Sequence, residues 1–160
     1  MDRYNHGEFV NADSNKIQNG KAYKTKNGRT VYSGGGIMPD IFVPFDTNSL
    51  APALTALYLS PTLNNFIYSY YIQHKEEFKK YRSAGDFAMN FNQEESLWND
   101  LVLFAHKDSI DLADLPPTDK KIAQRRIKAL LARQPWRNEG FFEVLNLTDP
   151  VVKRALDELN

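Results

Sequence analysis

The side chains best suited to metal binding or proton transfer in this chain are three histidines. His6, His74 and His106 lie far apart in the sequence, and no Glu-x-x-His or His-Glu-x-x-His motif is present. On a helix, His74 and Glu77 would share a face at i, i+3, but two ligands do not make a zinc site. The sequence therefore predicts no metal centre and favours solvated or capping histidines.

Motifs for nucleophilic and acid–base catalysis are also missing. None of the eight serines lies in Gly-x-Ser-x-Gly or Ser-x-x-Lys, and the absence of cysteine excludes disulfides, zinc–thiolate sites and thiol nucleophiles. The acidic pairs at 76–77 and 94–95 are adjacent, so on a helix their side chains point about 100° apart. Acid–base carboxylates must face one cavity. We therefore expect no catalytic residue and no cofactor.

A glycine run, Gly34-Gly35-Gly36, raises the question of a phosphate-binding loop. Such a loop needs glycines between a strand and a helix N-terminus, so that free amides point at the anion. Here Pro39 and then a strand-like run follow, with no Gly-Lys-Ser/Thr. The pattern therefore indicates a turn or a close backbone approach.

Positive charge clusters in the segment 120–137, which contains no acidic residue. One interpretation is a basic helix face that binds an acidic partner. The other is the solvated outer face of an amphipathic helix, because most of these side chains lie off the apolar stripe. With 20 basic against 20 acidic residues, the chain lacks the positive surplus typical of nucleic-acid coats. The predicted interaction face consists of Lys121, Arg125, Arg126 and Lys128.

The elements that position these residues divide the chain into two regions. Residues 1–47 are predicted to be irregular and β-rich, with strands at Ala22–Thr25, Thr30–Tyr32 and Ile41–Val43 joined by tight turns. Three short strands have open edges and a thin apolar face, so we expect them to pack against something else. Residues 48–160 are predicted to form a separate helical domain.

Helical periodicity runs through the second region, with Gly85 ending the second helix and Pro135 breaking the fourth. We therefore predict a mainly α fold, a β-hairpin segment followed by a compact bundle of five or six helices. The longest uncharged stretch, 47–74, is interrupted by prolines and amides, so no membrane span is expected, and no signal peptide is visible. The predicted helices begin at Ser49, at Ser60-Pro61, at Asn92, at Thr118 or Asp119, at Trp136 and at Asp149-Pro150.

One thirteen-residue segment resembles a signature of the C-terminal processing peptidases, also called tail-specific proteases. In that family a Gly-Arg-x-Val-Tyr strand is followed by Gly-Gly-Gly-Ile-x-Pro-Asp and another strand, and Ser33 stands here where glycine is expected. Similarity also extends to Asp2-Arg3-Tyr4 upstream and to 149–156 near the C-terminus. The matching residues are Gly28, Arg29, Val31, Tyr32, Gly34, Gly35, Gly36, Ile37, Pro39 and Asp40.

The resemblance implies a serine endopeptidase with a serine–lysine dyad, a preceding PDZ domain and an extracytoplasmic, for example periplasmic, location. The family's dyad lies upstream of the Gly-Arg-x-Val-Tyr strand. Only 27 residues precede Gly28, and they hold no Ser-Ala-Ser or Gly-Lys-Gly, since Gly20-Lys21 is followed by alanine. No catalytic residue is therefore transferred, and Met1 need not be a biological start.

The sequence thus predicts the non-catalytic C-terminal portion of such a peptidase. Its expected partners are the missing catalytic and PDZ portions, the parent's protein or peptide substrates and a second copy of the chain. The helical domain would buttress the protease core, mediate oligomerisation or limit substrate access. The alternative is a stand-alone helical module that binds an acidic partner through the basic face between Lys120 and Arg137.

Overall fold

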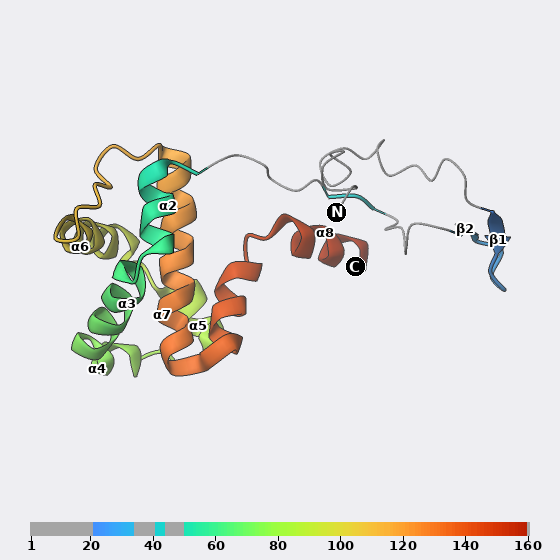
Figure 1. Ribbon diagram of the computed structural model, residues 1–160. Helices are drawn as coiled ribbons and strands as arrows, with labels where there is room; N and C mark the ends of the chain where they lie inside the picture. The colour runs from blue at the N-terminus through green and yellow to red at the C-terminus, as the bar shows by residue number, and fades with distance from the viewer. Residues whose placement is uncertain (1–20, 34–40, 44–49, 160) are drawn as a thin grey trace. The chain divides into compact units, whose positions relative to one another are not determined.

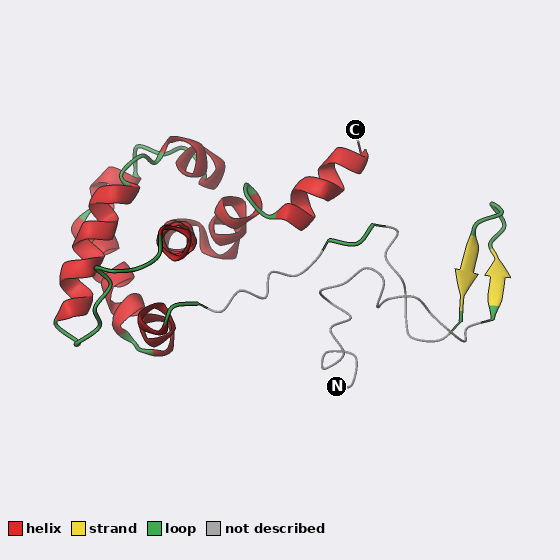
Figure 2. Ribbon diagram, turned by 90° about the horizontal axis from the view of Figure 1, so that it is seen from above, coloured by secondary structure: helices red, strands yellow, loops and turns green. Residues whose placement is uncertain are grey.

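A computed structural model describes residues 21–33, 41–43 and 50–159 (Figure 1). The chain divides into two compact units, Met1–Asn48 and Ser49–Asn160, and the predicted boundary lies one residue earlier. The prediction of a mainly α fold with an N-terminal hairpin is confirmed. Figure 2 shows the contrast between the two-stranded hairpin and the helical unit.

The hairpin pairs β1 (Ala22–Lys24) with β2 (Thr30–Tyr32) in antiparallel register, with Tyr23 opposite Val31. The turn between them closes through a hydrogen bond of 2.9 Å from the Gly28 amide to the Thr25 carbonyl. Gly28 has φ +78°, the left-handed conformation that a type I turn with a G1 bulge requires at this position. The Asn-Gly signal in the sequence therefore identified the turn.

The third predicted strand, Ile41–Val43, is wrong. These residues adopt no strand conformation, and the described sheet contains only β1 and β2. Three β-favouring residues form a strand only when another strand supplies backbone hydrogen bonds, because propensity reflects packing on a sheet.

The helical unit contains seven helices in the described residues, and Figure 1 labels them in chain order. They are α2 (Pro52–Leu59), α3 (Thr62–Gln73), α4 (Lys75–Phe78), α5 (Ala84–Asn90), α6 (Glu94–His106), α7 (Pro117–Asn146) and α8 (Pro150–Leu159). None of the described helices is long and apolar enough to cross a membrane.

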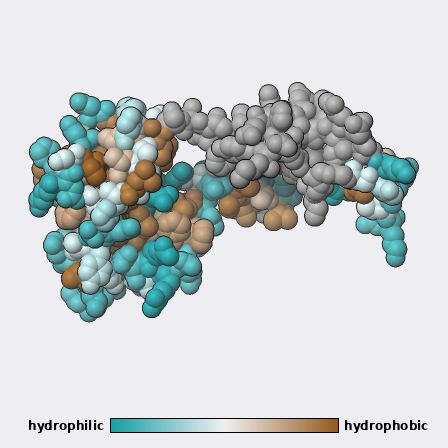
Figure 3. All heavy atoms as spheres, in the orientation of Figure 1, coloured by the Kyte–Doolittle hydropathy of each residue, from teal (hydrophilic) through white to brown (hydrophobic). Residues whose placement is uncertain are grey.

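Helices α2 through α7 share one hydrophobic core. Leu54 and Leu57 of α2 are fully buried, and so are Leu97 and Leu101 on one face of α6. The visible surface of this unit is mostly hydrophilic, with scattered apolar side chains (Figure 3). The remaining large, fully buried apolar side chains are Ile67, Phe87, Leu112, Ile127 and Leu131.

Helix α2 begins later than predicted. Its N-cap is Ala51 and Pro52 occupies the first turn, where proline costs no hydrogen bond; the predicted cap, Ser49, lies outside the described residues. The Ala51 amide instead donates to Oδ2 of Asp119 at 2.7 Å. Asp119 is buried in the first turn of α7, where a negative charge is favoured by the helix dipole. The same carboxylate therefore accepts a hydrogen bond from the N-cap of α2 and stabilises the N-terminus of α7.

The starts of α3 and α6 lie within a residue or two of their predicted positions. Ser60 has extended backbone, Pro61 is already helical, and Ser60 Oγ accepts a hydrogen bond from the Thr62 amide at 3.3 Å. Pro61 is the N-cap of α3 and makes no side-chain cap hydrogen bond, so the helix begins at Thr62, one residue after the predicted Ser60-Pro61. Helix α6 is flanked by Gln93 without a side-chain cap and begins at Glu94, two residues after the predicted start at Asn92.

The single long helix predicted from Pro61 to Gly85 is also wrong, because the chain leaves the helix at His74 (φ −108°, ψ 16°). A straight helix of that length would carry Phe78 and Tyr81 past the core. The bend brings both rings onto Phe87, with centroids at 5.6 and 5.1 Å. Burial of two aromatic rings outweighs the few helical hydrogen bonds that the bend costs.

Gly85 does not end a helix but lies in the first turn of α5. Ser83 is the N-cap, and its Oγ accepts a hydrogen bond from the Asp86 amide at 3.1 Å. Asp86 in turn accepts hydrogen bonds from the Arg82 amide at 2.8 Å and from Asn90 Nδ2 at 2.6 Å. The Ser-x-x-Asp spacing was the readable signal of a helix start.

These hydrogen bonds give a prediction for Asp86. The Arg82 amide, followed by Asn90, lowers the pKa of its carboxyl below the usual 3.8. A lowered folded pKa means that the ionised cap stabilises the fold above pH 3.8, and that this contribution is lost as the pH falls through the folded value. We expect an NMR titration to show Asn90→Ala raising the pKa of Asp86 towards 3.8. An unchanged pKa in that variant would contradict the assignment of this hydrogen bond.

Helix α7 is two helical limbs that meet at a reversal. The predicted break after Pro135 is confirmed, since Arg137 has φ 58° and ψ −143° inside the element. The second limb returns so close to the first that a Cβ on Gly140 would lie 2.5 Å from the carbonyl oxygen of Ala132. Only glycine permits this approach without displacement of the backbone.

The last helix, α8, begins at the predicted Asp149-Pro150. Asp149 Oδ1 accepts hydrogen bonds from the amides of Val151 and Val152 at 2.8 and 3.0 Å, as an N-cap does. No residue of α8 is buried, and Val151 and Leu159 are exposed. Its apolar face therefore differs from those of α2 to α7, which contribute to the core.

Candidate functional site

Two parts of the molecule were predicted to matter for function, and the first is the glycine-rich motif. Its first half lies on the hairpin, where Arg29 follows the turn and β2 holds Val31 and Tyr32. All six strand residues are exposed. Ser33, the departure from the family pattern, closes the base of the hairpin, since its Oγ accepts a hydrogen bond from the Lys21 amide at 3.0 Å. The second half, Gly34, Gly35, Gly36, Ile37, Pro39 and Asp40, lies outside the described residues.

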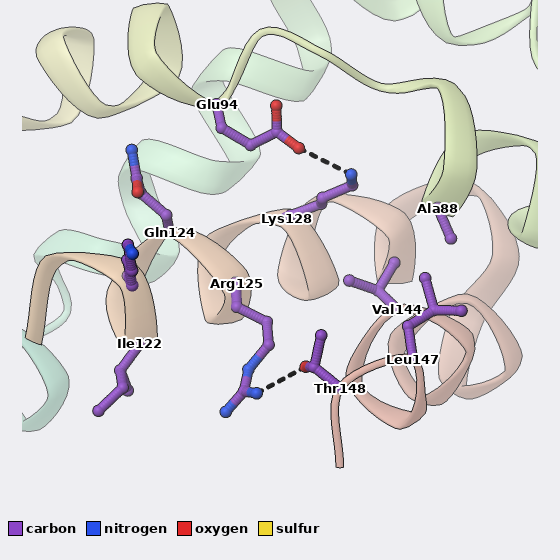
Figure 4. A pocket seen from close by; sticks show the side chains of 10 residues that line it. Ala88, Glu94, Ile122, Gln124, Arg125, Lys128, Val144, Leu147 and Thr148 are labelled. Atoms are coloured by element: carbon purple, nitrogen blue, oxygen red, sulfur yellow. Dashed lines mark hydrogen bonds and ion pairs between the residues drawn. The ribbon is translucent and has the colours of Figure 1, made fainter. Parts of the chain in front are cut away.

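The second part is the basic face of α7. Lys121, Arg125 and Lys128 follow one another at i, i+4 and i+7, so they lie on one side of the first limb. The structure brings these three together around a cavity of about 390 Å³, which we call the basic pocket. Figure 4 shows Arg125 and Lys128 beside it. The opposite wall comes from the second limb and the residues after it, at Val144, Leu147 and Thr148.

The ammonium group of Lys128 is paired within the helical unit. Its Nζ lies 2.8 Å from Glu94 Oε1, donates to the Phe91 carbonyl oxygen at 3.1 Å and sits 5.6 Å from the centre of the Phe91 ring. A half-buried amine with these partners joins α7 to the start of α6. Lys128 is therefore a structural residue, and its ion pair with Glu94 lowers the net positive charge of the basic pocket.

Arg125 is oriented by the same wall of the pocket, because its guanidinium donates a hydrogen bond to Thr148 Oγ1 at 2.6 Å (Figure 4). This contact fixes the arginine without neutralising it. Lys121 also lines the pocket and is exposed. Within the described residues, neither Lys121 nor Arg125 forms an ion pair.

Arg126, the fourth residue of the predicted face, lies elsewhere. Its guanidinium sits 4.8 Å from the centre of the Tyr58 ring, on α2. Burial raises the pKa of Tyr58 above 10.0, and Arg126 partly offsets this by favouring the phenolate, while Asp119 raises the pKa further. Arg126 therefore contacts α2 and does not line the basic pocket with Lys121, Arg125 and Lys128.

Lys120, at the start of the basic segment, is also paired. Its Nζ donates to Glu95 Oε2 at 2.7 Å, and Gln124 donates to the other oxygen of that carboxylate at 2.9 Å. The Lys120 hydrogen bond, then that of Gln124, lowers the pKa of Glu95 below 4.5. The pair Glu94-Glu95 therefore neutralises two lysines of α7, a role that the sequence analysis did not assign to it.

Potential metal ligands do not cluster in the part of the chain that the structure describes. Among the described residues, no group of three or more histidine, aspartate or glutamate side chains is placed to hold a metal ion. His74 lies against Tyr70, with ring centroids 4.1 Å apart, and its Nδ1 is 2.9 Å from the Tyr70 carbonyl oxygen. This histidine therefore helps to end α3.

A second cavity, which sequence reasoning missed, lies between α3 and the first limb of α7. Its volume is about 610 Å³, and its lining is more polar than that of the basic pocket. Arg133 and Arg137 reach it from α7, while Tyr68 reaches it from α3. The arginines were visible in the sequence at i, i+4, but no sequence signal indicated that α3 would lie beside them.

Comparison with known proteins adds one finding. A model described as a family of unknown function (DUF8443) matches residues 53–137. The matched segment runs from the first turn of α2 to the reversal within α7. No curated protein and no solved structure matches this chain.

Proposed function

We propose that this chain, which belongs to DUF8443, a family of unknown function, is the non-catalytic C-terminal portion of a serine endopeptidase that resembles the tail-specific proteases. In this proposal the DUF8443 match lies in an accessory helical domain. Its role would be to buttress the protease core, to mediate oligomerisation or to limit access of substrates.

The observation that carries this proposal is the run Gly28–Asp40, which has the order and spacing of that family's signature. The conformation of its first half is consistent with the proposal. Gly28 is the left-handed residue of a hairpin turn, and Tyr32 is 55% exposed on the strand that follows. An aromatic, β-branched strand with no buried face is typical of a segment that completes a larger sheet.

The separation of the chain into two units supports the second part of the proposal. The helical unit has its own core of buried apolar side chains, so it does not need the hairpin in order to fold. A domain with a complete core is suited to a structural or gating role beside a catalytic centre. The catalytic serine and lysine would lie on the parent protein, because no residue here matches them.

The experiment that tests this proposal uses an antibody against the helical unit. Immunoprecipitation from the source cells should recover a polypeptide larger than 18.4 kDa that cleaves unstructured protein substrates. The purified 160-residue chain is the matched control and should show no turnover. Recovery of only an 18.4 kDa species without peptidase activity would overturn the proposal.

A second candidate function, an interaction module for an acidic partner, is favoured by one observation. Lys121 and Arg125 lie at the basic pocket without an ion-pair partner in the part of the chain that the structure describes. In this case a polyanion such as polyglutamate should bind with strong salt dependence. Binding should be lost in a Lys121→Ala/Arg125→Ala variant, and retention of binding there would exclude this site.

A further inference from the structure

The cavity between α3 and α7 has the features of a binding groove for a charged partner. We call it the α3–α7 groove and define it by Asn64 and Tyr68 on α3 and by Arg133, Gln134, Arg137 and Asn138 on α7. Its volume of about 610 Å³ lies within the usual range for binding sites. All the defining residues except Asn138 fall inside the segment that matches the family model.

The charge of the groove is unbalanced, because two arginines line it and no acidic residue does. In the described part of the chain, neither Arg133 nor Arg137 is paired with a carboxylate. The Arg133 guanidinium instead sits 5.9 Å from the centre of the Phe141 ring. Lys120 and Lys128 on the same helix are both neutralised by glutamates. The groove is therefore one of two places on α7, with Arg125 at the basic pocket, where arginine charge is left for a partner.

Amide side chains supply the second feature. Asn64 and Asn138 are exposed at the groove, and each offers both a donor and an acceptor. Gln134 is half-buried, and its Nε2 donates to the Leu130 carbonyl oxygen at 3.3 Å, which fixes the orientation of its amide. Donor and acceptor pairs of this kind match the N–H and C=O groups of an extended peptide backbone.

An exposed apolar strip flanks the same groove. Tyr68 is 62% exposed and Ile72, one turn later on α3, is 49% exposed. An aromatic ring with a polar end is a favourable contact for a peptide at a solvated interface. Together with the arginines, this strip favours a protein segment over a simple inorganic anion.

The backbone at Arg137 supplies the last feature. Its φ of 58° and ψ of −143° mirror the polyproline conformation, which glycine adopts freely and which other residues adopt only with strain. Glycine would adopt this conformation at the reversal of α7 without strain. The arginine at this position instead lines the groove, so its strain is consistent with a requirement for its side chain.

We propose that the α3–α7 groove binds an extended, acidic protein segment, with carboxylates paired to Arg133 and Arg137 and backbone groups paired to the amides. This inference does not depend on the parent being a peptidase, because it rests on the helical unit alone. It also differs from the second candidate function, which uses Lys121 and Arg125.

The test is fluorescence anisotropy with the full chain and a labelled peptide of about ten residues in which serine and glutamate alternate. We expect saturable binding that weakens as salt rises. Arg133→Ala/Arg137→Gly should weaken it by about tenfold or more, a typical loss for two charge-assisted contacts. The matched control, Lys80→Ala/Lys107→Ala, removes equal charge from exposed positions outside the groove and the basic pocket and should change affinity by less than about threefold.

Arg137→Gly alone separates a binding role from a structural one. This variant should unfold at a higher temperature than the wild type, because strain is relieved, and yet bind the peptide more weakly. Equal losses in the two double variants, an unchanged affinity in Arg137→Gly, or equally tight binding of a short oligothymidylate would each overturn the proposal. The first and third outcomes would mean that the helical unit attracts any polyanion through its overall charge.

Discussion

Phe87→Ala is expected to destabilise the helical unit by about 3–5 kcal/mol. Phe87 is fully buried on α5, and its ring lies against those of Phe78, Phe91 and Trp136 at centroid distances of 5.6, 4.8 and 5.5 Å. Removal of the ring takes away both its own burial and one partner of each aromatic pair. A cavity at this position cannot close easily, because it is surrounded by rigid rings from several helices.

Urea unfolding followed by far-UV circular dichroism measures this effect for Phe87. Met89→Ala on the same helix is the matched control, since Met89 is 72% exposed and its truncation should change the free energy of unfolding by no more than about 0.5 kcal/mol. A loss below about 1 kcal/mol for Phe87→Ala would mean that α5 does not pack on α7 in solution.

Gly140→Ala is the second substitution with a large expected effect. Alanine normally stabilises a helix by about 1 kcal/mol relative to glycine. Here the added Cβ would lie 2.5 Å from the Ala132 carbonyl oxygen and 2.9 Å from Trp136 Cβ. Neither neighbour can move without separating the two limbs of α7, so we expect a net destabilisation of about 2–3 kcal/mol.

The control for this prediction is Gly85→Ala. The tightest contact of a Cβ on Gly85 would be with Glu143 Oε1 at 3.1 Å, the far end of a flexible and exposed side chain, and Ser83 Oγ would lie at 3.9 Å. This variant should therefore be neutral or slightly stabilising by the same denaturation measurement. If Gly140→Ala is as well tolerated as Gly85→Ala, the close approach of the two limbs is not present in solution.

The sequence predicted those parts of the fold that depend on local pattern. The Asn-Gly turn identified the hairpin, Ser60-Pro61 identified the start of α3, and the spacing of Leu97 and Leu101 identified the buried face of α6. Each of these signals acts over a few residues. The bend at His74 depends instead on aromatic partners in α5, and no pattern within the segment encodes it.

The same distinction applies to the candidate sites. Helical spacing placed Lys121, Arg125 and Lys128 on one side of α7, and that placement is confirmed. The tertiary structure decides which of these positive charges remain unpaired and able to bind a partner. Lys128 is neutralised by Glu94, which comes from another helix. The α3–α7 groove likewise requires two helices to lie side by side, which a single sequence does not show.

The dependence of α5 on α7 also has a consequence for protein synthesis. Phe87 leaves the ribosome well before Trp136 and the returning limb at Gly140, which complete its surroundings. Because the chain is synthesised at about 5–20 residues per second, several seconds pass between the synthesis of these helices and that of the last part of their core. We expect their aromatic side chains to be open to chaperones during that interval, until the reversal at Arg137 has formed.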